Sequence, residues 1–543
     1  MIKVFRLLRP SRRLLALALL ALLVAETCPF IYPLLLQRIL DGGAIHGSTQ
    51  DFWRWILAYA ALVMVHSVFL FGRTFTGQRL SIDVTYHLRL RLFHHLQRLP
   101  LRFLQQTPVG STMTRLSSDV DAFGTLFSEG FLEIVGSILL LFLSVGVMLS
   151  MDWRLGLATL VFFPALFGIS AWFRARFRSL QTRFRNELAS LNAFLQETLN
   201  GVVIIQTFSR LSWMQQLFQI RNQAFRKVTL SYARHYAGFF PLIQSLSDLS
   251  LVTCYAAALW LIGRGQLSVG TLVAFAWFAS IYSRPLRDLS DRINTLQTAL
   301  AAGDRTAEFL AQPEEATPQG GVQIHPHSDI PALSFREVYF AYPEGSSVLH
   351  GLSFDLAPRE SVALTGTTGC GKSTTLQLAL RFLVPQQGRI QIFGEDLSRI
   401  DVDSLRAQVA WLGQDPFLFP ASIADNICLG HPYETSRFSE VCRRAQLEPW
   451  LVTLPEGVDT LVGTGGRGLS SGQRQLIAYA RALYQDPAIL LLDEPSASLD
   501  ASTEHALQLA LRELLVGRAA LIVSHRPASI TACDREMHLP EGV

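Results

Sequence analysis

Charged residues are scarce in this chain. They make up 17% of its 543 residues, whereas an average soluble domain has about 25%. Hydrophobic residues supply half of the sequence, and their excess lies in residues 1–300. The six cysteines form no C-x-x-C pair, so neither a zinc site nor a disulfide framework is indicated. No internal repeat is present. The composition therefore predicts a membrane domain followed by a soluble one.

Six long apolar runs account for the hydrophobic excess. The first has 23 residues, which at 1.5 Å per residue is long enough to cross a hydrocarbon layer of about 30 Å. It follows a basic segment, as a secretory signal does, but it is too long and no small-residue cleavage site follows it. We therefore expect six spans, at about residues 14–36, 53–75, 130–151, 155–173, 237–263 and 269–287.

Basic residues are concentrated at alternate ends of these spans. Residues 1–13 contain five Lys or Arg, the loop at 41–51 contains none, and the segments at 76–129 and 174–236 are rich in Arg. By the positive-inside rule, the amino terminus, both long segments and the carboxyl-terminal domain are cytoplasmic. This predicts a multi-pass protein of an inner (plasma) membrane. The net charge of +4 reflects this anchoring bias and does not indicate nucleic-acid binding.

The two cytoplasmic segments are rich in helix formers. Read as paired helices of about 25 residues, each would extend roughly 35–40 Å below the bilayer. At their midpoints, Phe103–Gly110 and Asn200–Phe208 combine apolar side chains with a Gly or Pro that can end a helix. A polar linker, residues 303–332, separates this domain, residues 1–302, from residues 333–543.

The second domain contains a phosphate-binding loop. Residues 366–373 have the sequence GTTGCGKS, which fits G-x-x-x-x-G-K-[ST]. In such a loop backbone N–H groups surround phosphate oxygens, Lys372 reaches the β- and γ-phosphates, and Ser373 can hold Mg²⁺. An apolar run then ends in Asp493, which would share the metal, and Glu494, which would lie beside the attacking water. The two motifs in this order favour a nucleotide hydrolase over a mere glycine-rich turn before a helix.

Further motifs narrow this interpretation. Residues 468–475 have the sequence GLSSGQRQ, a glutamine stands at position 414, and residues 523–525 are VSH. With six spans before one such domain, nearly the whole chain resembles a half-transporter of the ABC exporter family. The resemblance implies an all-α transmembrane domain with long cytoplasmic helical extensions, followed by an α/β ATP-binding cassette that works in a dimer. The midpoints of the cytoplasmic segments resemble the coupling helices of such exporters.

The same resemblance assigns functional residues. It implies that Glu494, the switch histidine His525 and the Q-loop residue Gln414 are catalytic, and that Ser373, Gln414 and Asp493 hold Mg²⁺. Tyr342 would stack on adenine, and the signature motif, Leu469–Gln473, would bind the ATP held by the partner's phosphate loop. The implied ATP-binding set is Tyr342, Gly366, Thr367, Thr368, Gly369, Cys370, Gly371, Lys372, Ser373, Thr374, Leu469, Ser470, Ser471, Gly472 and Gln473.

The sequence leaves several alternatives open. Export of a small or amphipathic molecule, a drug or a lipid, is favoured over import of a metal–siderophore ligand and over an ATP-gated channel or regulator. The partner is either a second copy or a different half-transporter, and Ser471, where glycine is usual, hints at the second of these. Glu26, within the first span, either lines a substrate cavity or pairs inside the bundle; Asp248, in the fifth, is ambiguous. Membrane lipids are an expected partner.

Cys370, within the phosphate-binding loop, leads to an expectation about thiol reactivity. Its place beside Lys372 and the backbone N–H groups of the loop predicts an electropositive setting that favours a reactive thiolate, which MgATP would protect. The alternative is a thiol that points away from the nucleotide and packs against the neighbouring strand.

Overall fold

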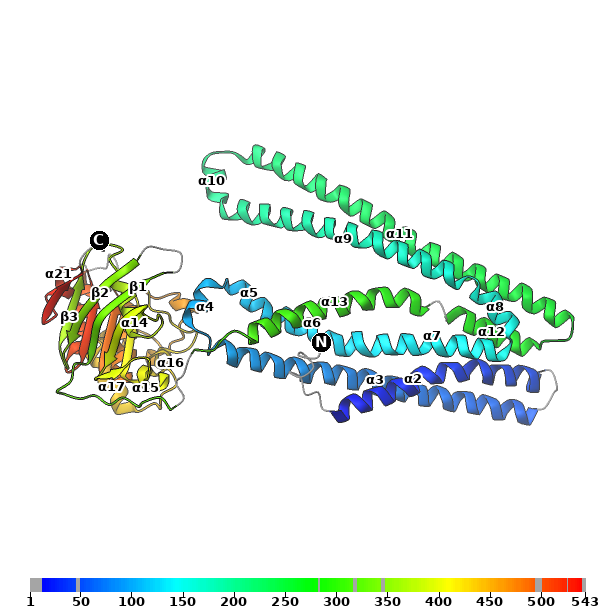
Figure 1. Cartoon of the computed structure of the whole chain (residues 1–543), viewed down its shortest axis with the longest axis horizontal. Helices are drawn as coiled ribbons and strands as arrows, with labels where there is room; N and C mark the ends of the chain where they lie inside the picture. The colour runs from blue at the N-terminus through cyan, green and yellow to red at the C-terminus, as the bar shows by residue number, and fades with distance from the viewer. Residues whose placement is uncertain are drawn as a thin grey trace. The chain divides into compact units, whose positions relative to one another are not determined.

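The computed structural model describes residues 12–44, 49–281, 284–315, 320–342, 347–493, 501–524 and 526–539. The chain forms two compact units (Figure 1). The helical unit comprises Met1–Gln97 and Pro108–Gln312. The α/β unit comprises Arg98–Thr107 and Pro313–Val543. This confirms the expected order of a helical domain followed by an α/β domain.

Long helices dominate the helical unit. Its elements are α2 (Arg12–Arg38), η1 (Ile39–Ala44), α3 (Thr49–Leu96), α5 (Val109–Thr114), η2 (Arg115–Asp119), α6 (Val120–Thr125), η3 (Leu126–Phe131), α7 (Leu132–Met151), α8 (Trp153–Leu160), α9 (Phe163–Asn200), α10 (Val202–Thr207), α11 (Leu211–Gly263), α12 (Val269–Ile281) and α13 (Arg284–Leu310).

Five helical segments of the described chain are long and apolar enough to cross a membrane: Arg13–Asp41, Phe52–Leu96, Leu132–Met151, Trp153–Asn200 and Leu211–Gly263. At the sixth expected span lies the shorter apolar helix α12. The fourth expected span is two helices rather than one. Pro164 occupies the first turn of α9, where its missing N–H costs nothing, so the chain breaks between α8 and α9.

The second of the segments expected to be cytoplasmic, residues 174–236, belongs to a helical hairpin. Figure 1 shows α10 at its tip, between the long helices α9 and α11. Aromatic pairs join the two arms, among them Phe177 with Tyr232 at 4.6 Å between ring centroids and Phe184 with Phe225 at 5.3 Å. Gly201 ends α9 by leaving the helical backbone conformation, as expected for this midpoint. The first segment has two short helices at its midpoint, α5 and α4 (Leu101–Gln106), the latter in the α/β unit.

Polar side chains within the spans are paired. The Arg73 guanidinium contacts the Glu26 carboxylate at 2.6 Å and also that of Glu133. Gly136 leaves room for this pair, because a Cβ there would lie 3.1 Å from Glu26 Oε1. Of the two alternatives for Glu26, the structure shows pairing inside the bundle. Asp248 is exposed within this chain and accepts a hydrogen bond from a neighbour on its own helix.

A carboxylate joins two segments of the helical unit that lie far apart in the sequence. Asp41, in η1, accepts hydrogen bonds from the Gly270 backbone N–H at 3.0 Å and the Ser268 hydroxyl at 2.8 Å. Gly270 lies in the first turn of α12, whose backbone N–H groups carry partial positive charge, so Asp41 stabilises this end. A side chain at position 270 would overlap the carboxylate, because its Cβ would lie 2.6 Å from Asp41 Oδ1.

The α/β unit contains two sheets. A parallel sheet has the order β6-β7-β8-β3-β9, and an antiparallel sheet has the order β2-β1-β4-β5. Besides α4, its elements are β1 (Leu333–Ala341), β2 (Ser347–Leu356), β3 (Ser361–Thr365), α14 (Lys372–Ala379), β4 (Gln387–Ile392), β5 (Glu395–Asp396), α15 (Val402–Gln408), β6 (Val409–Leu412), α16 (Ile423–Cys428), α17 (Thr435–Arg444), α18 (Glu448–Leu451), η4 (Gly457–Asp459), η5 (Thr464–Gly466), α19 (Ser471–Gln485), β7 (Ile489–Asp493), α20 (Ala501–Leu515), β8 (Ala519–Val523), α21 (Pro527–Ile530) and β9 (Arg535–His538).

The parallel sheet separates two hydrophobic cores. Successive side chains of a strand point to opposite faces, so Leu491 and Leu521 join the core shared with the antiparallel sheet. Leu490 and Ile522 join the core formed with α16, α17, α19 and α20. Strands β3 and β8 are buried along their whole length, as expected for central strands of a sheet covered on both faces.

Candidate nucleotide-binding site

Four functional segments meet at one edge of the parallel sheet. The phosphate-binding loop follows β3, the segment with Gln414 follows β6, Asp493 ends β7, and Ser524 follows β8. Because these strands are parallel, their carboxyl ends lie at the same edge, where open α/β sheets bind ligands. The register confirms the proximity of two of these segments, since Leu412 pairs with Leu492.

Three glycines shape the phosphate-binding loop. Gly366, Gly369 and Gly371 have φ values of +148°, +93° and +101°, which side-chain-bearing residues rarely adopt. At Gly371 space is also short, because a Cβ there would lie 2.7 Å from Leu349 Cδ2. Gly369 faces open space, with no atom of the described chain within 4 Å of its Cβ position. The loop is therefore tight on its inner side and open at its middle.

Lys372 closes the loop from within. Its ammonium group donates hydrogen bonds to the carbonyl oxygens of Gly366 and Thr367, both at 2.8 Å. The side chain is buried, with 8% of the residue exposed. No side chain of the described residues caps the amino end of α14, so its first-turn N–H groups and the Lys372 charge form a positive site suited to phosphate.

A hydroxyl and a carboxylate meet beside the loop. The Ser373 Oγ donates to Asp493 Oδ1 at 3.2 Å, across 120 residues of sequence. Both are hard oxygen donors of the kind that Mg²⁺ prefers, so the residues present fit this ion. The described residues contain no group of three His, Cys, Asp or Glu side chains arranged for a metal. A bound Mg²⁺ would therefore need phosphate or water oxygens to complete its ligands.

Tyr342 contacts the first turn of α14. Its hydroxyl is 3.2 Å from Thr374 Oγ1, and its ring meets Phe340 edge-on at 5.0 Å between centroids. The residue is 40% exposed, so its side chain is not closed off by the described residues. The structure thus places Tyr342 beside the loop, as the adenine-stacking hypothesis requires.

The signature residues begin helix α19. Ser470 caps this helix by accepting from the Gln473 N–H at 3.2 Å, while the Gln473 side chain accepts from the Ser470 N–H at 2.9 Å. This reciprocal pair is a capping box, which fixes the start of the helix at Ser471. Gly468 precedes it with a φ of +96°, and Leu469 and Gly472 are partly or fully buried. Thus Ser470 and Gln473 have a structural role as the cap of α19, in addition to the ATP contacts expected of them.

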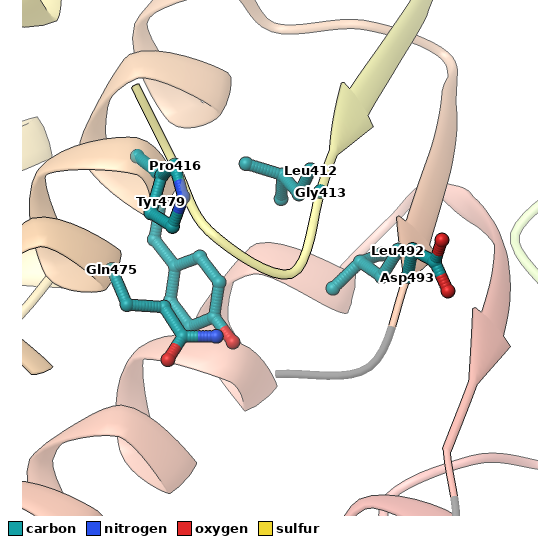
Figure 2. A pocket seen from close by; sticks show the side chains of 8 residues that line it. Leu412, Gly413, Pro416, Gln475, Tyr479, Leu492 and Asp493 are labelled. Carbon is teal, nitrogen blue, oxygen red and sulfur yellow. The ribbon is translucent and has the colours of Figure 1, made fainter. Parts of the chain in front are cut away.

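A small pocket lies between α19 and the ends of β6 and β7 (Figure 2). Gln475 and Tyr479 line it from the helix, and Asp493 lines it from the strand. Burial raises the pKa of Tyr479, while the Arg526 charge and a hydrogen bond with Gln475 lower it. The sequence reasoning missed both residues. Their signal was two polar side chains four positions apart on an otherwise apolar helix face.

Three expectations on this site have other outcomes. Glu494 and His525 lie outside the described residues. The exposure expected for the Cys370 thiol is not found, because the residue is 7% exposed and belongs to the core between the sheets. The expected neighbour is present, since the Lys372 ammonium lies 3.8 Å from the Cys370 Sγ. Its Sγ would lie 2.8 Å from a Cβ at Gly366, so the thiol fills the space that this glycine leaves. Burial agrees with the alternative of a packed thiol, and the neighbouring ammonium agrees with the expected electropositive setting.

A carboxylate just before β9 is bonded to the first residue of β3, at the opposite edge of the sheet. Asp534 accepts hydrogen bonds from the Ser361 hydroxyl at 2.7 Å and the Ser361 N–H at 2.9 Å. These bonds favour the charged form and hold the pKa of Asp534 below its usual value, against a smaller opposing effect of burial. The contact fixes the beginning of β3, whose end carries the phosphate-binding loop.

Family models match both units. The model described as "ABC transporter transmembrane region" matches residues 15–286, and the model described as "ABC transporter" matches residues 349–497. The transmembrane-region model covers the helical unit as far as the first residues of α13. The ABC transporter model includes the phosphate-binding loop, the signature residues and Asp493.

Relatives match along almost the whole chain. The ABC transporter ATP-binding protein YknU of Bacillus subtilis (strain 168) is 30% identical, over 98% of this chain and 91% of that protein. The ATP-dependent lipid A-core flippase of Thiobacillus denitrificans is 29% identical, over 98% of this chain and 92% of that protein. A bacterial Atm1-family ABC exporter solved with ATP bound has a TM-score of 0.79 at 25% identity, covering 98% of this chain and 94% of that chain.

Proposed function

Because this chain belongs to the ABC transporter family, we propose that it couples hydrolysis of MgATP at the site above to export of a small amphipathic molecule. ATP binding, ATP-driven transport and integration in a membrane are the activities of the family. The observation that carries the proposed site is the contact between Ser373 and Asp493, which joins the phosphate-binding loop to the acidic end of β7.

Each residue of the site has a proposed task. Lys372 and the N–H groups of the loop attract the phosphates, and Tyr342 stacks on the base. Ser373, Asp493 and Gln414 would hold Mg²⁺, which when bound neutralises charge on the β- and γ-phosphates. Glu494 would polarise the attacking water and His525 would contact the γ-phosphate.

The chain acts in a dimer, as the half-transporter architecture requires. We infer that the signature residues of each chain complete the ATP site of the other. The tip of the α9–α11 hairpin supports a coupling role for α10, because Val203, Ile204 and Phe208 expose 64–69% of their surface there. Apolar side chains at such a tip are suited to a protein partner. A homodimer and a heterodimer both fit these observations.

The substrate proposal rests on the relatives and on the helical unit. A flippase for lipid A-core among the relatives supports an amphipathic substrate. Because Glu26 pairs with Arg73, it gives no support to a cationic one. The Arg-rich segments at 76–129 and 174–236 support a cytoplasmic amino terminus and nucleotide domain, and an inner-membrane location.

Reconstitution in liposomes tests the proposal. ATP hydrolysis is measured with lipids, drugs and siderophores in turn, and transport is followed in inside-out vesicles. We expect stimulation by an amphipathic compound, transport out of the cytoplasmic side, and loss of both in Glu494→Gln with ATP binding retained. ATP hydrolysis by Glu494→Gln at the wild-type rate would contradict the role assigned to Glu494. Movement of the compound from the external face of the membrane to the cytoplasmic face would contradict export.

A further inference from the structure

Helix α19 carries a buried polar pair that the proposed ATP site does not use. Gln475 and Tyr479 are 4% and 2% exposed and lie one helical turn apart. Their side chains are hydrogen-bonded to each other. Figure 2 shows the Gln475 amide and the Tyr479 hydroxyl close together at the side of the pocket. A polar pair in an apolar core needs a reason, since an apolar pair would fill the same space without desolvating polar groups.

The pair faces the segment that connects β6 to α16. Leu412, Gly413 and Pro416 of this segment line the same pocket, together with Leu492 and Asp493 at the end of β7. Gln414, the proposed Q-loop residue, stands between Gly413 and Pro416 and is exposed. The buried pair therefore lies behind a short segment whose exposed side carries a proposed metal ligand.

The next turn of α19 contacts the same segment. Arg481 donates from its guanidinium to the Phe417 carbonyl at 3.2 Å and to the Asn426 carbonyl at 2.9 Å. The segment Gly413–Phe417 thus meets α19 twice, once across the pocket and once at Phe417. Because Ser471 begins this helix, a displacement of the signature residues moves Gln475, Tyr479 and Arg481 with it, as parts of one rigid element.

We propose that Gln475 and Tyr479 are positioning residues that hold the segment Gly413–Phe417, and thereby Gln414, beside Asp493. The inference rests on the proposed function, which assigns Gln414 to the metal. The Tyr479 hydroxyl acts as a neutral hydrogen-bonding group, since burial keeps it protonated. Through this pair the start of α19 and the segment after β6 form one mechanical unit.

The chain offers a matched control on the same helix. Tyr484 is also 2% exposed and hydrogen-bonded, since its hydroxyl donates to the Pro432 carbonyl at 2.5 Å and accepts from the Glu434 N–H at 3.1 Å. It points to the loop before α17 rather than to the pocket. Tyr479→Phe and Tyr484→Phe each remove one buried hydroxyl, but only the first removes it from the pocket.

Two measurements on the full-length protein test the proposal. Hydrogen exchange of the backbone amides of residues 413–415 and 417 is followed without nucleotide, and kcat and KM for ATP are measured in liposomes. Tyr479→Phe should speed exchange in this segment and lower kcat roughly 3- to 10-fold, the effect of one lost hydrogen bond, with KM for ATP within about twofold. Tyr484→Phe should leave both the exchange and kcat as in the wild type.

A second variant separates the pair from the single residue. Gln475→Leu should reproduce the Tyr479→Phe effects, and the double variant should be no worse than the stronger single one, because the two residues act as a unit. Equal exchange and equal kcat in Tyr479→Phe and Tyr484→Phe would overturn the inference. A wild-type protein without ATP hydrolysis would instead contradict the proposed function, so the two failures are distinguishable.

Discussion

The guanidinium of Arg73 lies 2.6 Å from the carboxylate of Glu26, with both side chains largely buried in the helical unit. Removing one partner leaves the other charge uncompensated, which typically costs about 3–5 kcal/mol. We expect Arg73→Met to lower the unfolding temperature in detergent strongly, because Glu26 and Glu133 then lose a shared counterion. Thermal unfolding followed by circular dichroism measures this.

An exposed pair on the same helix gives the control. Arg89 contacts Asp121 at 2.8 Å, but both side chains are more than half exposed. Exposed pairs contribute about 0–1 kcal/mol, so Arg89→Met should unfold close to the wild type. Similar unfolding temperatures for Arg73→Met and Arg89→Met would show that the buried pair contributes little.

Lys372→Met should weaken ATP binding roughly 10- to 100-fold, the effect of a lost hydrogen bond between a charged donor and a phosphate. Its ammonium also donates hydrogen bonds to two loop carbonyls, so the loop should become more mobile in the variant. Titration with a fluorescent ATP analogue gives the affinity. Lys227→Met, on the exposed surface of α11, is the matched control and should bind as the wild type does. An unchanged affinity in Lys372→Met would contradict the assigned phosphate contact.

Two loop glycines should differ in their response to alanine. Both Gly369 and Gly371 have positive φ, so each alanine variant is strained. Only Gly371 is also crowded, with Leu349 Cδ2 at 2.7 Å from the Cβ position. We expect Gly371→Ala to lower both the unfolding temperature and ATP affinity more than Gly369→Ala. The reverse order, measured by thermal unfolding and nucleotide titration, would show that backbone strain outweighs the crowding.

Alkylation of Cys533 should depend unusually on pH. Burial, with a contribution from Asp534, raises the pKa of the Cys533 thiol to about 11. Since the thiolate is the reactive form, its rate should rise about tenfold per pH unit, still rising above pH 9, where an ordinary thiol with a pKa near 8.5 levels off. Peptide mass spectrometry after short maleimide pulses gives the rate, and Cys533→Ser identifies the peptide. A plateau near pH 9 would mean that the thiol is not buried in solution.

Most of the architecture was predictable from the sequence because its signals are local. Apolar runs long enough to cross a membrane predict helices such as α7 without knowledge of their neighbours. The break before Phe163 was missed, although Pro164 is a local signal, because the surrounding apolar residues hide it in a hydropathy profile. The partner of Glu26 was left open, since Arg73 is 47 residues away and only packing brings them together.

The candidate site shows the same limit. The loop pattern predicted the place of Lys372, because glycine spacing and the following helix determine it. The direction of the Cys370 side chain was not predictable, since it depends on the space above Gly366. Tyr479 was missed for a similar reason. Tyr479 matters because it lines a pocket opposite the end of β7. Helical spacing within α19 does not reveal which element forms the other wall of that pocket.

The cap on α12 has a consequence for biosynthesis. Asp41 is 229 residues before Gly270, and its carboxylate accepts a hydrogen bond from the Gly270 N–H. At about 5–20 residues per second, roughly 10–45 s separate the synthesis of these two residues. During that interval four further apolar segments are translated, and the first turn of α12, which Asp41 contacts, does not yet exist. A nascent chain stopped before residue 268 would therefore lack Ser268 and Gly270, the two residues that donate hydrogen bonds to Asp41, while α2 could already pack against α3 and α7.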